Sequence, residues 1–305
     1  MPESLIQKIL FAGIPVVRAI GIILCPVPIV LGILRYGFKY ILLITLPIAF
    51  MAFVLSFVLK LPSMLTLLSV GTFGLLLGGL IREGFLPGKI VLIGGIVLLL
   101  ILGFEIIFFQ RLGYSPFRTI SSLITYLKEY FSALEAQEKI SLKDIEQMKD
   151  YCDSAILRLS LLIPAMLILG AFIYTYLSYE VTRVILGSMG YQLIRPLPIS
   201  ILRIPDILVW GFILGWMAML VGEWQEIKNL YVIGLNIRCT FEALYILVGL
   251  GIATFFLNKY NLPIMVKLLA YFVLILGLKI VMFVGIFDTW FNFRRLKPIK
   301  TPNET

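Results

Sequence analysis

The sequence predicts an all-α membrane protein, folded as a bundle of about eight transmembrane helices. Its mean hydropathy is +1.02, and charged residues make up only 14% of its 305 positions. Uncharged runs of about 20 residues, the length that a helix needs to cross a bilayer, recur along the chain. These runs are continuous apolar blocks, whereas a transmembrane barrel would show shorter segments of alternating polarity. The composition therefore excludes an ordinary soluble domain, and the pattern excludes a barrel.

Eight apolar segments account for the predicted spans. They cover residues 14–34, 40–59, 64–81, 90–109, 155–179, 207–222, 230–257 and 262–287. Pro26 and Pro28 lie in the first segment, and because proline removes backbone donors, this segment is predicted to be broken, kinked or re-entrant. We therefore predict about four spans in residues 1–109 and about four in residues 155–287.

Glycine spacing predicts close packing between some of these helices. Gly74 and Gly78 are four residues apart, as are Gly211 and Gly215. Small residues at this spacing let two helix backbones approach each other in a membrane. The glycines indicate that helices touch there, but they do not indicate what the protein binds.

A polar insertion, residues 110–154, separates the two groups of spans. Within it, Leu123, Leu127 and Phe131 recur at helical spacing, which predicts an amphipathic helix. A second helix is predicted from Ser141, where "SLKD" has the form of a capping box. These helices could lie in the membrane interface, cover a cavity as a lid, or bind a cytoplasmic protein partner.

The net charge of +9 is spread over the connections between spans and is not gathered on one soluble face, so nucleic acid is not an expected partner. If all eight segments cross, the face with both termini has 14 Lys and Arg residues and the other face has eight. Cytoplasmic connections are enriched in Lys and Arg. We therefore expect a multi-pass protein of the cell (inner) membrane, in contact with lipid, with both termini in the cytoplasm.

Residues 288–305 form a basic tail after the last predicted span. Trp290 and Phe293 suit a membrane interface, and Arg294 and Arg295 could lie against anionic headgroups. This pattern predicts an interface anchor. The alternative is a peptide that binds a cytoplasmic partner.

The residue types exclude several kinds of chemistry. The chain has no histidine, and its three cysteines are far apart, so neither a metal site nor a disulfide framework is expected. It lacks HExxH, GxSxG and the phosphate-binding GxxxxGK[ST] pattern. We therefore expect a protein that is not an enzyme and that carries no cofactor.

Ionisable residues inside the spans are the candidate binding residues. Arg238 and Glu242 are four residues apart in "GLNIRCTFEALY", so they share one helix face and can pair, and Asn236 lies one turn from Thr240. Lys279 and Glu105 are further candidates from other spans. Such residues within a membrane indicate a solute or ion pathway by default. The alternative is that they only cross-link the bundle.

Four segments together resemble one known family. They are "CPVPIVLGILRYGFK", "LPISILRIPDILVWGFI", "GLNIRCTFEALYILVGLGIATFFL" and "VGIFDTWFNFRRLK". In order and spacing they are similar to the YybS-like bacterial membrane proteins, which are distantly similar to the substrate-capturing subunits of energy-coupling-factor vitamin transporters. The resemblance implies a transporter-like component that binds a small solute and has no ATPase of its own. The alternative function is a membrane scaffold or assembly factor, which would bind a cytoplasmic protein through residues 110–154 or the tail.

Overall fold

The computed structural model describes residues 22–58, 62–111, 151, 154 and 157–296. The predicted insertion lies almost entirely outside the described residues, as do the start of the first predicted span and the end of the tail. Every regular element within the described ranges is helical, which confirms the all-α prediction. The chain divides into two compact units, 1–156 with 170–196 and 157–169 with 197–305. One boundary between the units lies within the helix Ile163–Ser188 and another follows Pro196.

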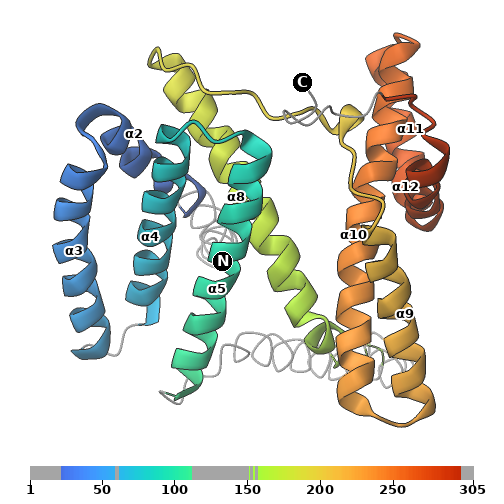
Figure 1. The fold of residues 1–305 in the computed structure, drawn as a ribbon, viewed down its shortest axis with the longest axis horizontal. Coiled ribbons are helices and arrows are strands. Elements are labelled where there is room, and N and C mark those ends of the chain that lie inside the picture. Colours follow the sequence, from blue (N-terminus) through green and yellow to red (C-terminus); the bar gives the residue numbers. More distant parts are fainter. Residues whose placement is uncertain (1–21, 59–61, 112–150, 152–153, 155–156, 297–305) are drawn as a thin grey trace, which may run out of the picture. The chain divides into compact units, whose positions relative to one another are not determined.

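Among the described residues, five helices contribute to the first unit (Figure 1). They are α2 (Pro26–Tyr36), α3 (Phe38–Val58), α4 (Pro62–Arg82), α5 (Pro87–Arg111) and the greater part of α8 (Ile163–Ser188). Their shared core includes Val30, Phe73, Leu77 and Tyr179. Cys25 interrupts the helical pattern that begins at Ile22, and α2 starts at Pro26, where a missing backbone donor costs no helical hydrogen bond.

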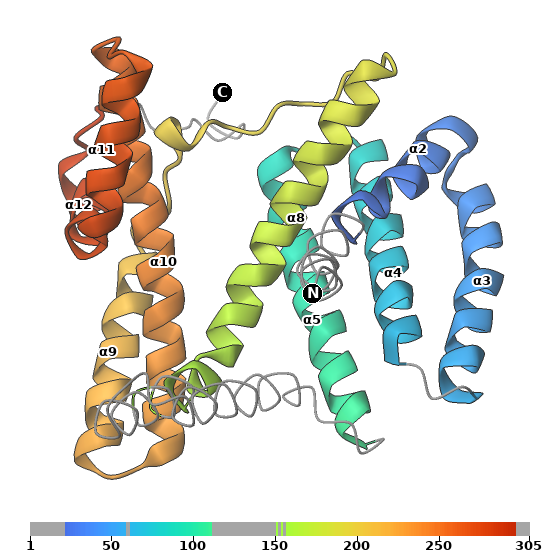
Figure 2. The same ribbon diagram turned by 180° about the vertical axis from the view of Figure 1, so that it is seen from behind.

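The second unit is built on a hairpin of two helices, α9 (Leu208–Trp224) and α10 (Lys228–Lys259), which lie side by side in Figures 1 and 2. Glycines bring the two backbones together. A Cβ added at Gly215 would lie 2.7 Å from the backbone nitrogen of Arg238, and one at Gly222 would contact the backbone of Tyr231. Gly211 and Gly215 therefore lie in a close helix contact, as their spacing predicted.

Three further elements pack on α10 or follow it. They are the short 3-10 helix η1 (Ile199–Ile201), α11 (Ile264–Leu276) and α12 (Leu278–Phe291). A Cβ at Gly251 would contact the carbonyl oxygen of Ile199, so η1 lies directly against α10. A Cβ at Gly285 would contact the carbonyl oxygen of Tyr245, so α12 crosses α10 with almost no space between them.

The lengths of the helices refine the predicted spans. Among the described residues, four helices are long and apolar enough to cross a membrane: Phe38–Leu55, Pro87–Phe108, Ile163–Ser188 and Lys228–Lys259. Shorter apolar helices cover Ile22–Tyr36, Leu68–Arg82 and Leu208–Trp224. The predicted span over 262–287 consists of two helices, α11 and α12, with a bend of 96° at Gly277, so the pair is either one broken span or a re-entrant loop.

Candidate functional site

The second unit brings two of the predicted candidates, Arg238 and Glu242, together on α10. Arg238 Nε donates a hydrogen bond to Glu242 Oε1 at 3.2 Å, as the spacing of four residues allows. The side chain of Arg238 is 20% exposed and that of Glu242 is 12% exposed. An arginine at the centre of a membrane helix costs about 2.5–3.5 kcal/mol on insertion scales, so its charge needs partners inside the protein.

Two residues of α9, which the sequence did not single out, complete the surroundings of Arg238. The guanidinium carbon lies 4.2 Å from the centroid of the Trp216 ring, a close cation–π contact. Arg238 Nη1 lies 3.2 Å from the sulfur of Met219. Gly215 makes this arrangement possible, since a side chain there would meet the backbone of Arg238. The glycine spacing was the available signal for this contact, but it did not identify Trp216 or Met219.

Lys279 of α12 joins the same cluster. Its Nζ donates to Glu242 Oε1 at 3.1 Å, so two cations share one carboxylate oxygen. Lys279 is 69% exposed, whereas Glu242 is almost buried. We call Arg238, Glu242 and Lys279, with Trp216 and Met219, the Arg238 cluster. With all three groups ionised, the cluster carries one net positive charge.

The break between α11 and α12 gives the Arg238 cluster a second source of positive potential. Gly277 ends α11, α12 begins at Leu278, and Lys279 is therefore in the first turn of α12. The first turn of a helix carries unpaired backbone N–H groups and a partial positive charge. Lys279 adds a full charge at the same helix end.

Asn236 has different partners from the rest of the predicted site. Its Nδ2 donates to the carbonyl oxygens of Leu161 and Val232, at 2.7 and 2.8 Å, and its Oδ1 accepts from the backbone N–H of Ala165 at 2.8 Å. The amide therefore bridges Leu161 and Ala165, a pair that would bond directly in an uninterrupted helix. Pro164 lies between them. The structure thus places Asn236 at the start of α8 and not in the Arg238 cluster.

Glu105 belongs to the first unit. It lies on α5, and its Oε1 accepts a hydrogen bond from the Ser69 hydroxyl of α4 at 2.7 Å. The five predicted candidates therefore form three groups: the Arg238 cluster, the Asn236 bridge and the Glu105 carboxylate.

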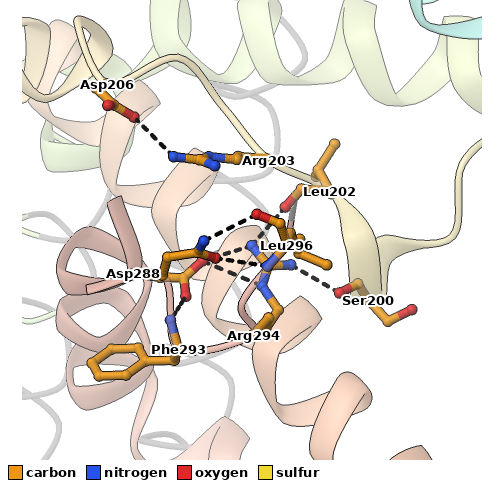
Figure 3. Close-up of polar contacts among 9 residues, drawn as sticks. Ser200, Leu202, Arg203, Asp206, Asp288, Phe293, Arg294 and Leu296 are labelled. Carbon is orange, nitrogen blue, oxygen red and sulfur yellow. Dashed lines mark hydrogen bonds and ion pairs between the residues drawn. The ribbon is translucent and has the colours of Figure 1, made fainter. Parts of the chain in front are cut away.

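The predicted interface anchor includes one residue that is buried instead. Arg294 has 0% of its side chain exposed and pairs with Asp288 Oδ2 through Nη2 at 2.7 Å and Nε at 3.2 Å (Figure 3). It also donates to the carbonyl oxygens of Ser200 and Leu202, both at 2.9 Å. The anchor prediction is therefore wrong for Arg294, whose charge is used within the protein. Trp290, Phe293 and Arg295 are exposed, and for them the anchor stays a prediction.

Asp288, which was not among the predicted candidates, holds the turn that follows α12. Its Oδ1 accepts from the backbone N–H of Phe293 at 2.8 Å while its Oδ2 holds Arg294, so one carboxylate fixes both the turn and the guanidinium. Asn292 ends α12 in the left-handed conformation, with φ of 43°. We call the pair of Asp288 and Arg294, together with the carbonyl groups of Ser200 and Leu202 to which Arg294 donates, the Arg294 latch.

A comparison with known families identifies the class of protein. A family model described as "Predicted membrane protein (DUF2232)" matches residues 4–289, nearly the whole chain. The chain belongs to this family. Together with the apolar helices, this makes it an integral membrane protein with several membrane helices, in contact with lipid. Neither the curated proteins nor the solved structures contain a match.

The described residues offer no cluster of three or more Cys, Asp or Glu side chains that could hold a metal ion. The two cysteines that they include, Cys25 and Cys239, are both free thiols. The Arg238 cluster presents two cationic groups, one carboxylate and one aromatic face.

Proposed function

We propose that this protein is a transporter-like membrane component that binds a small anionic solute at the Arg238 cluster. The observation that carries the proposal is the sharing of Glu242 Oε1 by Arg238 and Lys279, which leaves one positive charge uncompensated within the cluster. A carboxylate or phosphate group of a solute would supply the missing charge. Arginine and lysine are the usual partners of such groups.

The exposure of Lys279 supports a binding role. Arg238 and Glu242 are mostly enclosed, but 69% of the Lys279 side chain is accessible, so an incoming anion can reach the ammonium group. The start of α12 adds backbone N–H groups beside it. Transporters often use the ends of broken membrane helices in this way, because such ends present positive potential within the bilayer.

The resemblance of the four quoted segments to YybS-like proteins supports the same function. It implies a solute-binding subunit that depends on another protein for energy, in agreement with a sequence that lacks a phosphate-binding loop. We extend the proposal accordingly: the protein is not an enzyme. Its location is the inner membrane of a bacterial cell, with residues 110–154 on the cytoplasmic face.

The test is mass spectrometry of the small molecules that the purified protein retains in mild detergent. Wild type is compared with Lys279→Gln, a change at an exposed side chain that leaves the Arg238–Glu242 pair in place. The control is Lys267→Gln, which removes another exposed ammonium group, bonded to Asn258 Oδ1 in the same unit. We expect wild type and the control to retain a carboxylate- or phosphate-bearing compound, and Lys279→Gln to lose it by about tenfold or more.

Equal retention by wild type and Lys279→Gln would contradict the proposal, and so would the absence of any small anion from folded wild type. A second variant, Arg238→Lys, keeps the charge but removes the planar group from the face of Trp216. We expect it to weaken retention of the anion, with its folding checked by thermal unfolding.

The alternative function is a membrane scaffold or assembly factor. The specific observation in its favour is that Arg238 already has Glu242, Met219 and Trp216 as partners, so the cluster can serve as a cross-link between α9 and α10. This function predicts a protein partner that co-purifies equally with wild type and Lys279→Gln. If the mass spectra are recorded under native conditions, they show bound proteins as well as bound small molecules. One experiment then distinguishes the two functions.

A further inference from the structure

A groove of about 360 Å³ lies in the first unit, between α3, α4 and α5. Its walls are apolar except near one carboxylate. We call it the Glu105 groove; the side chains that the following argument uses are Phe53, Ser69, Val97, Phe104, Glu105 and Phe108. Its size is within the range of sites that hold small molecules in proteins.

Glu105 brings a negative charge into this apolar groove. Within the described part of the chain, its hydrogen-bond partner is the Ser69 hydroxyl at 2.7 Å, and no lysine or arginine is paired with it. A carboxylate in an apolar setting is unfavourable unless it is neutralised or paired. A bound cation would supply the missing charge.

The aromatic side chains of the groove favour an organic cation over a metal ion. Phe104 and Phe108 are stacked with ring centroids 6.0 Å apart, and the centroid of Phe53 lies 6.3 Å from that of Phe108. The faces of aromatic rings attract ammonium groups, most strongly where water is excluded. One carboxylate among phenylalanines is a poor set of ligands for a metal ion, which prefers several oxygen donors.

The position of Glu105 indicates that the ligand comes from the membrane. Glu105 is one helical turn from the end of the apolar stretch Pro87–Phe108, so it lies at the depth where a headgroup meets the hydrocarbon. Leu100, Phe104 and Ile107 are exposed on the same helix, which leaves the surroundings of the groove open to lipid chains. An alkyl chain can thus lie along α5 while its headgroup reaches the carboxylate.

We propose that the Glu105 groove binds a membrane amphiphile whose headgroup carries an ammonium group. Glu105 pairs with the ammonium group, the three phenylalanines surround it, and the apolar wall holds the chain. This site is independent of the Arg238 cluster and of the anion proposed to bind there.

Native mass spectrometry of the full-length protein tests the site with defined probes. Dodecylamine is compared with dodecanol, which has the same chain and no charge, and nanodiscs of phosphatidylethanolamine are compared with nanodiscs of phosphatidylglycerol. We expect wild type to retain dodecylamine in preference to dodecanol. We expect Glu105→Gln to reduce that retention about tenfold or more, because the charge-assisted contact is lost.

Two further variants make the result specific. Val97→Phe keeps the carboxylate but fills the groove, and it should also lose dodecylamine. Glu223→Gln removes an exposed carboxylate of α9 and should bind as wild type does. Thermal unfolding of each variant separates lost binding from lost folding.

The lipid probes identify the source of the amine. Retention of phosphatidylethanolamine, and displacement of dodecylamine by it, would assign the groove to a lipid headgroup; retention of dodecylamine alone would assign it to a free amphiphilic amine. The proposal is overturned if folded Glu105→Gln retains as much dodecylamine as wild type. Equal retention of dodecanol and dodecylamine by wild type would overturn it too.

Discussion

Arg294 shows what a local sequence pattern can and cannot predict about one residue. Aromatic and basic residues after an apolar run are typical of a membrane interface, and Trp290, Phe293 and Arg295 keep that character. Arg294 differs because Asp288 and the carbonyl groups of Ser200 and Leu202 surround it, and two of these partners lie more than 90 residues earlier. By contrast, the pairing of Arg238 with Glu242 followed directly from their spacing, since both partners are on one helix.

We predict that Arg294→Gln destabilises the protein by about 3–5 kcal/mol, because it leaves the buried carboxylate of Asp288 without its cation. Arg295→Gln is the matched control: the neighbouring arginine is exposed, and its change should cost no more than about 0.5 kcal/mol. Unfolding free energies in mixed micelles, measured by titration with a denaturing detergent, provide the comparison. Equal stability of Arg294→Gln and wild type would show that the latch contributes nothing.

The positions of the helices could largely be predicted from the apolar runs of the sequence. The bend between α11 and α12 could not. Two apolar runs, 207–222 and 230–257, became α9 and α10 with ends within two residues of the prediction. No proline near Gly277 indicated the bend. A glycine within an apolar run does not predict one either, because glycine is also common in straight membrane helices. Packing explains the break: α12 must turn to cross α10 at Gly249 and Gly285.

At this crossing, we predict that Gly285→Ala is strongly destabilising, by about 1–3 kcal/mol or more, because its methyl group would meet the carbonyl oxygen of Tyr245 and the backbone nitrogen of Gly249. Backbone atoms cannot rotate away as side chains can. Gly103→Ala on α5 is the control, since a Cβ there has no neighbour within 4 Å. That change should be neutral or stabilising by up to about 1 kcal/mol. The measurement is the thermal unfolding temperature of each variant in the same detergent. Equal unfolding temperatures for Gly285→Ala and Gly103→Ala would contradict the prediction.

For the whole molecule, the contacts of α12 bear on the face of the membrane at which the chain emerges after it. Lys279, at the start of α12, reaches Glu242, 17 residues or about 25 Å before the end of α10 at Lys259. Arg294, beyond the end of α12, binds the segment beside Gly251, only about 12 Å from that end. Since α11 begins just after Lys259, these contacts bring the start of α11 and the residues after α12 toward the same end of α10, as in a re-entrant hairpin.

We therefore predict that the α10–α11 turn and the residues after α12 lie on the same face of the membrane. Single cysteines at Tyr260 and Phe293, both exposed, in a variant without the native cysteines, should react with an impermeant maleimide from the same side. A cysteine at Gln225, in the turn between α9 and α10, should react from the other side, because α10 crosses between them. Labelling of Tyr260 and Phe293 from opposite sides would instead make the bent pair one broken span.

This arrangement changes the charge argument made from the sequence. A re-entrant pair would put the four basic residues of the tail on the opposite face, and the two faces would then carry ten and 12 Lys and Arg residues. The bias that placed both termini in the cytoplasm depended on eight complete crossings. Apolar runs predict which segments enter the membrane, but whether a bent pair crosses or returns depends on contacts between residues that are distant in the sequence.

The Arg294 latch also sets an order of events during synthesis. Arg294 follows Ser200 by 94 residues, which a ribosome adds in about 5–20 s at typical rates. During that interval the carbonyl groups of Ser200 and Leu202 have no guanidinium to bind, and unpaired backbone groups are tolerated in water but not in hydrocarbon. The carbonyl groups of the segment around η1 must therefore stay in contact with water while α9 to α12 are inserted. Its placement against α10 becomes final only when the newly made arginine arrives.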